Sequence, residues 1–219
     1  MAASHQLSPI YRAFVSSTFE ELKDHRAQVI EALRRARFFV DPMEDWAAAK
    51  DEPTDLSLDR MRGCDLCVLL VGFRRGHIPN DQELSITQLE YGAAVAHGVD
   101  VLVFMLDEQA AWPRKFDELD RDPQIRRWRE QLKKKRTVSF FDNDLHSIKI
   151  ESALTRWVMD VQSKGMSLDE YRKMKMDFER LERLIRKAPV VENSDAYHAF
   201  EIPKSLIREF QSLAPKAER

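Results

Sequence analysis

The chain has 219 residues, of which 43% are hydrophobic and 33% are charged, which is enough for one α/β domain and a short extension. A net charge of −2 provides no general attraction to nucleic acid or to an anionic membrane. No apolar run approaches the roughly 20 residues of a membrane span, no secretory signal is evident, and two cysteines argue against a disulfide framework. We therefore expect a cytoplasmic protein, with nucleic acid and membranes unlikely as partners.

The first third of the chain begins with a short buried strand at residues 11–16. Ser17 and Glu20 fit a capping box, so we expect Ser17 to be the N-cap of a helix. A second short strand is expected at 37–40, then a polar loop over 41–53 and a short helix over 55–62.

The central third contains the clearest strand, at 65–71, which is apolar almost without alternation, as central parallel strands are. Ser85 and Gln88 form a second capping-box candidate, and the helix that it opens is expected to run to His97. Gly98 suits the position after that helix, and another apolar strand follows at 101–106.

The remaining elements are a charged helix at 124–135, a strand at 137–141 and an amphipathic helix at 145–161. Five strands thus alternate with helices, which predicts a parallel sheet covered on both faces. The expected architecture is a flavodoxin-like, three-layer α/β sandwich with strand order 2-1-3-4-5 and a switch point between the first and third strands.

The pattern changes after Gly165, and we divide the chain into an α/β domain at 1–163 and a helical extension at 164–219. A packing helix over 167–187 is expected because its apolar residues alternate at spacings of three and four. These residues are Tyr171, Met174, Phe178, Leu181 and Ile185.

Glu90 is the leading candidate for a catalytic or ligand-binding residue. With Ser85 as the N-cap, we expect a buried stripe on this helix, with Glu90 at its border. The stripe consists of Ile86, Leu89, Ala93 and Ala96. A carboxylate at such a border is costly unless it is paired or used, and it would face the carboxyl ends of the strands, where open α/β sheets bind ligands. The alternative is a structural pair between Glu90 and a nearby arginine.

Other candidate ligand-binding residues end strands at the same rim. Hydroxyl groups and helix amides there can hold a phosphate, and arginine suits phosphate recognition. Trp46 could stack on a base, or it could cover the sheet edge. The candidate substrate-binding residues are Ser16, Ser17, Thr18, Trp46, Gly72, Arg74, His77 and Thr87. For Ser17 the alternative is helix capping alone, and for the arginine loop it is a solvated surface.

Cys64 and Cys67 form a C-x-x-C pair, but it leads into a strand rather than opening a helix. Residues three apart in a strand point to opposite faces, so we expect structural cysteines and no metal site. The chain also lacks the glycine-rich dinucleotide fingerprint, the phosphate-binding P-loop, H-E-x-x-H and G-x-S-x-G.

Three segments together resemble a known family. They are 14–22 with Arg26, 64–76, and 85–91 followed by 101–104. They look like a domain of unknown function found at the N-terminus of NACHT and other STAND-type proteins and of tetratricopeptide proteins. That family is similar to TIR domains and nucleoside deoxyribosyltransferases. In catalytic relatives a glutamate before the fourth strand acts at the ribose, and Glu90 matches it.

The resemblance implies an effector domain that cleaves an N-glycosidic bond of a nucleotide, with NAD⁺ as substrate rather than cofactor, in a defence or signalling setting. No cofactor is expected, and a homo-oligomer or a STAND-type module is the expected partner. The main alternative is a non-catalytic self-association or adaptor module, and a third is deoxyribosyl transfer between bases. Released base on incubation with NAD⁺, ATP and deoxynucleosides would distinguish them.

Overall fold

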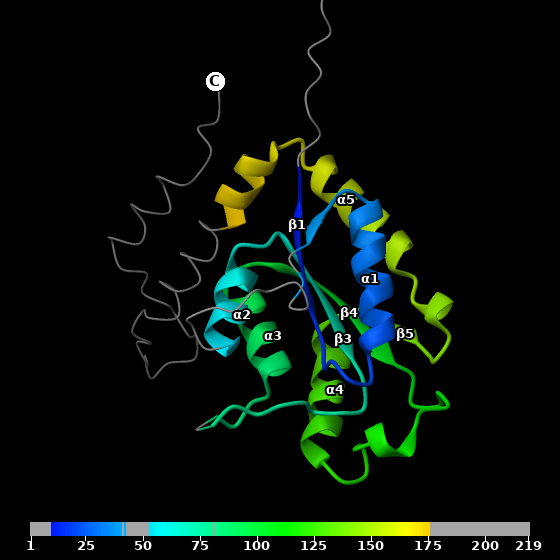
Figure 1. The fold of residues 1–219 in the computed structure, drawn as a ribbon. Coiled ribbons are helices and arrows are strands. Elements are labelled where there is room, and N and C mark those ends of the chain that lie inside the picture. Colours follow the sequence, from blue (N-terminus) through cyan, green and yellow to red (C-terminus); the bar gives the residue numbers. More distant parts are fainter. Residues whose placement is uncertain (1–9, 41, 43–52, 81, 176–219) are drawn as a thin grey trace, which may run out of the picture. The chain divides into compact units, whose positions relative to one another are not determined.

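The computed structural model describes residues 10–40, 42, 53–80 and 82–175 (Figure 1). The chain divides into two compact units, 1–168 and 169–219, and the candidate site lies in the first. Among the described residues, no helix has the length and apolar character needed to cross a membrane.

The centre of the first unit is a five-stranded parallel sheet with order β2-β1-β3-β4-β5, which confirms the predicted topology. β3 is buried along its whole length, in agreement with its continuous apolar sequence. The five strands are β1 (Arg12–Ser16), β2 (Phe39–Val40), β3 (Leu66–Val71), β4 (Asp100–Leu106) and β5 (Val138–Phe141). β2 is added on one side of β1, and β3, β4 and β5 are added on the other side. The switch point therefore lies between β1 and β3, where it was expected.

Helices cover both faces of the sheet, as Figure 1 shows. The helix at residues 23–35 packs against the helix at 150–163 on one face. On the other face the helix at 53–62 packs against the helix at 86–96, whose Tyr91 also contacts Trp128 of the helix at 123–135. The helices are α1 (Lys23–Arg35), α2 (Pro53–Arg62), α3 (Ile86–Ala96), α4 (Pro123–Lys135) and α5 (Ile150–Ser163).

Two helix starts differ from the prediction. α1 begins at Lys23 rather than after Ser17, and Leu22 takes the N-cap position without a side-chain hydrogen bond. The Ser17 hydroxyl donates to the carbonyl of Thr18 and accepts from Arg26, so it does not cap the helix. The segment predicted as one helix from residue 145 instead begins with a 3₁₀ turn, Leu145–Ser147, because the Asp144 carboxylate accepts from the amide of His146 and caps that turn.

The predicted helical extension is described only at its start. After Gly165, which has a φ of 65°, residues 168–175 are helical. On the predicted apolar stripe, Tyr171 is buried and Met174 is 39% exposed. Phe178, Leu181 and Ile185 lie outside the described residues, so the packing helix over 167–187 and the boundary at 163/164 stay predictions.

Candidate functional site

The start of α3 is defined by a complete capping box. The Ser85 hydroxyl accepts from the amide of Gln88 at 3.4 Å, and the Gln88 side chain accepts from the amide of Ser85 at 3.0 Å. Both bonds satisfy amides that the first helical turn would otherwise leave unpaired, and they confirm the predicted cap. The capping box thereby fixes the residue at which α3 begins, and the helix contacts β1 and β3.

The buried face of α3 differs from the predicted stripe. Its buried residues are Thr87, Glu90 and Ala94, whereas Ala96 is exposed. The other three predicted stripe residues, Ile86, Leu89 and Ala93, are only half-buried. The helix contacts α2 as well as the sheet, so more than one of its sides is covered. Glu90 therefore lies on the buried face itself and is 6% exposed.

Two serine hydroxyls hold the Glu90 carboxylate. Ser16, the last residue of β1, donates to Oε2 at 2.5 Å, and Ser57 of α2 donates to Oε1. Each oxygen thus accepts one hydrogen bond, and a carboxylate has further lone-pair sites for a ligand. Three elements far apart in the sequence, β1, α2 and α3, meet at this group.

Burial raises the pKa of Glu90 above its ordinary value because a charged carboxylate loses its hydration there. The hydrogen bonds from Ser16 and Ser57, and the positive charge of Arg26, act in the opposite direction without cancelling that effect. A carboxylate with a raised pKa, at the rim where open α/β sheets bind ligands, is a candidate for function.

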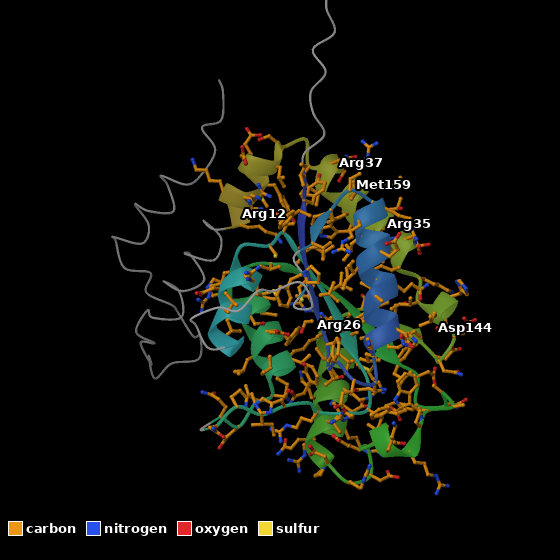
Figure 2. All side chains as sticks on the ribbon, in the orientation of Figure 1. Arg12, Arg26, Arg35, Arg37, Asp144 and Met159 are labelled. Atoms are coloured by element: carbon orange, nitrogen blue, oxygen red, sulfur yellow. The ribbon has the colours of Figure 1, made fainter. Side chains whose placement is uncertain are left out.

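Arg26 reaches this region from α1, on the other face of the sheet. It is 2% exposed, and its Nη1 donates to the carbonyl of Val15 at 2.9 Å and to the hydroxyl of Ser17 at 3.1 Å. Figure 2 shows Arg26 toward the interior, whereas Arg35 of the same helix lies toward the outside. A buried guanidinium with several acceptors fixes the end of β1 next to Ser16 and supplies positive charge near Glu90.

A cavity of about 280 Å³ opens beside Glu90. Its lining combines apolar side chains with hydroxyl, carboxylate and guanidinium groups. Gly76 forms part of the wall, with a φ of 85°, and a Cβ there would lie 2.7 Å from Cγ2 of Thr18. Glycine is therefore required by both the turn and the close approach. The lining residues are Phe14, Val15, Ser17, Thr18, Phe19, Glu20, Arg26, Arg74, Gly76, His77, Ile86, Thr87 and Glu90.

The structure brings most of the predicted site residues together. Glu90 and five of the eight predicted substrate-binding residues line the cavity: Ser17, Thr18, Arg74, His77 and Thr87. Ser16 lies behind it, in contact with Glu90. Gly72 is not among the lining residues, and its carbonyl accepts from Arg129 of α4 at 3.0 Å. Trp46 lies outside the described residues. The roles of all these residues stay predictions.

Arg74 is already bound by three carboxylates. Its Nη1 lies 2.8 Å from Oε2 of Glu20 and 3.4 Å from Oε2 of Glu21, and its Nε lies 3.3 Å from Oε1 of Glu118. The side chain of Glu21 is fully buried and also accepts from the hydroxyl of Thr18. Arg74 is thus a cation whose charge the protein itself neutralises with three carboxylates.

Ser57 and the carboxylates around Arg74 are parts of the site that were not predicted from the sequence. Nothing in the composition of α2 distinguishes Ser57, because its partner is 33 residues away. The position of Arg26 could have been recognised from the sequence. It lies four residues after Leu22 and three before Val29, so it falls on the apolar stripe of α1, where an unpaired charge is costly.

Comparison with known proteins places the chain in a family. A family model described as "Domain of unknown function (DUF4062)" matches residues 12–155. The chain belongs to this family. A search of curated proteins gave no match to the DUF4062 chain.

Two solved structures are similar to this DUF4062 protein. One is the Clostridium botulinum CMP N-glycosidase BcmB, with 18% identity and a TM-score of 0.40, where the match covers 67% of this chain and 98% of BcmB. The other is the TIR domains of the activated Roq1 resistosome that recognises the pathogen effector XopQ. There the identity is 13% and the TM-score 0.43, and the match covers 69% of this chain and 99% of the other.

The DUF4062 domain thus presents one fixed, buried carboxylate at the wall of a small cavity, with hydroxyl groups beside it. Such a group can stabilise positive charge that develops on a bound ligand, because few waters compete for it. It can also form a transient bond to carbon, since each of its oxygens has lone pairs left over.

Proposed function

We propose that this domain cleaves the N-glycosidic bond of a nucleotide or nucleoside and that NAD⁺ is the first substrate to test. The observation that carries the proposal is Glu90, a carboxylate that is 6% exposed, held by two serines and open to a cavity at the switch point of the sheet. Ligand sites of open α/β sheets lie at such switch points.

The chemistry suits a single carboxylate. In NAD⁺ the C1′–N bond breaks with its electron pair going to the nicotinamide ring, which leaves as a neutral base. Positive charge develops at C1′ and the ring oxygen of the ribose, and Glu90 stabilises that charge or bonds to C1′. Water then adds its oxygen to C1′ and releases one proton, which gives the free ribose hydroxyl. No acid is needed for the leaving group.

The supporting roles follow from the position of each side chain. Ser16 and Ser57 fix the orientation of the Glu90 carboxylate, which is the kind of preorganisation that such catalysis requires. We assign the cavity-lining residues Ser17, Thr18 and Thr87 to the ribose hydroxyls, and the apolar wall of Phe14 and Ile86 to a base or the sugar ring.

The test is incubation of the purified full chain with NAD⁺, ATP and deoxynucleosides, at dilute and at concentrated protein, with released base measured by chromatography. Glu90→Gln is the matched variant, because it keeps the shape and removes the charge. Release of base by the parent alone supports the proposal and identifies the substrate. No released base from the parent at any concentration contradicts it, and base exchange between deoxynucleosides would instead indicate deoxyribosyl transfer.

One observation favours a second candidate, a self-association module. Both edge strands of the sheet expose an aromatic side chain: Phe39 of β2 is 55% exposed and Phe140 of β5 is 47% exposed. Exposed edges that carry large apolar side chains are prone to pair with another chain. Phe140→Lys should then lower the oligomer size seen by light scattering, whereas an unchanged monomer in parent and variant contradicts this candidate. Association with a NACHT or STAND module, and a defence setting, stay predictions.

A further inference from the structure

We propose that the cavity beside Glu90 receives a glycoside end that is neutral or positively charged, that phosphate groups stay outside it, and that Glu20 sets this selectivity by neutralising Arg74. The inference rests on the proposed glycosidase function and names the class of substrate that the site selects. It reverses the expectation from the sequence that Arg74 binds phosphate.

The first step is the state of Arg74. Its guanidinium reaches Glu20, Glu21 and Glu118 at 2.8, 3.4 and 3.3 Å. Two of these partners are fixed: Glu21 is fully buried beneath the arginine, and Glu118 also accepts from the amide of Arg75 at 3.1 Å. Glu20 is different, because its side chain is 70% exposed and it lines the cavity. A phosphate that approached Arg74 would have to displace Glu20 or share the guanidinium with all three carboxylates.

The second step is the charge around the cavity. Among the described residues that line it or contact Arg74, two arginines face four carboxylates. Arg26 is engaged by the carbonyl of Val15 and the hydroxyl of Ser17. Arg75 does not line the cavity, and its side chain bonds Gln88 and the carbonyl of Glu83. An excess of negative charge in a partly closed space repels an anion and attracts a cation.

The third step is size. At about 280 Å³ the cavity lies just below the roughly 300–1,000 Å³ that ligand pockets span. It suits a base and one ribose, not a whole dinucleotide. A pyridinium riboside, which carries a positive charge on the ring, matches both the size and the charge. In a dinucleotide that carries the same end, the pyrophosphate and second nucleoside would lie outside the cavity.

The experiment compares compounds that share one base and differ in phosphate. Nicotinamide riboside, nicotinamide mononucleotide and NAD⁺ are given to the parent, to Glu20→Gln and to the control Glu31→Gln. Glu31 is also an exposed glutamate, 60% accessible, but it pairs with Arg35 on α1 and does not line the cavity. Arg74 itself is left intact, because its removal would leave the buried Glu21 unpaired and could unfold the domain.

We expect kcat/KM of the parent to be at least as high for the riboside as for the mononucleotide. Added salt should lower the value for the riboside and raise it for the mononucleotide, because salt screens both the attraction and the repulsion. In Glu20→Gln the ratio of mononucleotide to riboside should rise by about two- to five-fold, the size expected for one exposed ion pair. Glu31→Gln should leave the ratio unchanged.

A tenfold preference of the parent for the mononucleotide, or a ratio that Glu20→Gln does not move, overturns the inference while base release still supports the proposed function. If no compound releases base, the proposed function fails, and calorimetric binding of the riboside and the mononucleotide to the parent decides the inference alone. Tighter binding of the riboside supports it. Tighter binding of the mononucleotide, or no binding of either compound, overturns it.

Discussion

The hydroxyl of Ser57 donates a hydrogen bond to Oε1 of Glu90, so α2 supports a carboxylate on α3. Ser57 is 3% exposed and does not line the cavity, whereas Glu90 does. Under the proposed function Ser57 is thus a positioning residue, and the pKa of Glu90 should change when the Ser57 hydroxyl is removed.

The first prediction concerns Ser57→Ala. The hydrogen bond from Ser57 lowers the pKa of Glu90 against the effect of burial. Its loss should raise that pKa further, so the acidic limb of the profile of kcat/KM against pH should move to higher pH. Ser57→Thr, which keeps a hydroxyl, should restore the limb. Ser163→Ala, which removes an exposed hydroxyl at the end of α5, is the control. A lower melting temperature with an unmoved limb would mean that Ser57 has only a structural role.

The second prediction is that Glu90→Gln folds at least as stably as the parent and loses base release by about a hundredfold or more. Because the pKa of Glu90 is raised in the folded protein, folding favours the protonated form. The cost of ionising it is absent at low pH and grows as the pH rises from the unfolded value of about 4.3 through the folded value.

The gain in melting temperature of Glu90→Gln over the parent should therefore be largest at neutral pH and disappear in acid. Calorimetric melting of both proteins between pH 4 and pH 8 checks this. A variant that melts several degrees lower at neutral pH and keeps full activity would make Glu90 a structural ion-pair partner.

The third prediction is that Cys64 and Cys67 are structural. Burial raises the pKa of the Cys67 thiol well above its ordinary value, and the charge of Glu90 adds to the effect, so the reactive thiolate is scarce. Cys64 is half-buried, and its thiol donates to the carbonyl of Arg60 at 3.3 Å. A thiol reagent should label Cys64 before Cys67 in the native protein and both cysteines after denaturation.

Replacement of Cys64 by Ala together with Cys67 by Val should keep activity within a few-fold. Metal analysis of the parent should find less than one equivalent of zinc. Stoichiometric zinc in the parent, or loss of activity in a double variant that still folds, would contradict the structural role.

The fourth prediction concerns Arg129 of α4, which is 1% exposed. It donates to the carbonyls of Val71, Gly72 and Leu106 at 3.4, 3.0 and 2.7 Å, at the ends of β3 and β4. Arg129→Met should lower the free energy of unfolding by about 2–4 kcal/mol, because buried carbonyls lose their donors.

Arg126→Met, one turn earlier on the same helix, is the matched control. Its side chain is 50% exposed and pairs with the almost fully exposed Asp120, so its replacement should change stability by less than about 0.5 kcal/mol. Urea denaturation of the three proteins measures both effects. Equal losses in the two variants would mean that the carbonyl contacts of Arg129 contribute little.

The sequence was sufficient for the topology because each strand and helix carries its own local pattern. The continuous apolar run of β3 and the capping box of Ser85 depend on neighbours in the chain, and both were predicted correctly. The alternation of strands and helices predicted a parallel sheet with right-handed crossovers, and the order 2-1-3-4-5 is one that five such strands fit.

The details that failed depend on contacts between distant residues. Ser17 has the side chain of an N-cap, but Arg26 and the carbonyl of Thr18 engage its hydroxyl in the folded protein. The helix α3 also packs against α2, and no pattern within α3 indicates that contact. Ser57 contacts Glu90 only because α2 and α3 pack side by side in the folded domain.

The separation of these residues has a consequence for assembly. Ser16 and Glu90 are 74 positions apart, and Ser57 joins them from a third element. No short fragment of the chain can reproduce this group of residues, so a ligand that depends on it recognises the completed sheet and not its partly folded precursors. Such a ligand would raise the free energy of unfolding by RT ln(1 + [L]/Kd), and its presence during refolding would shift the population toward chains in which all three elements have docked.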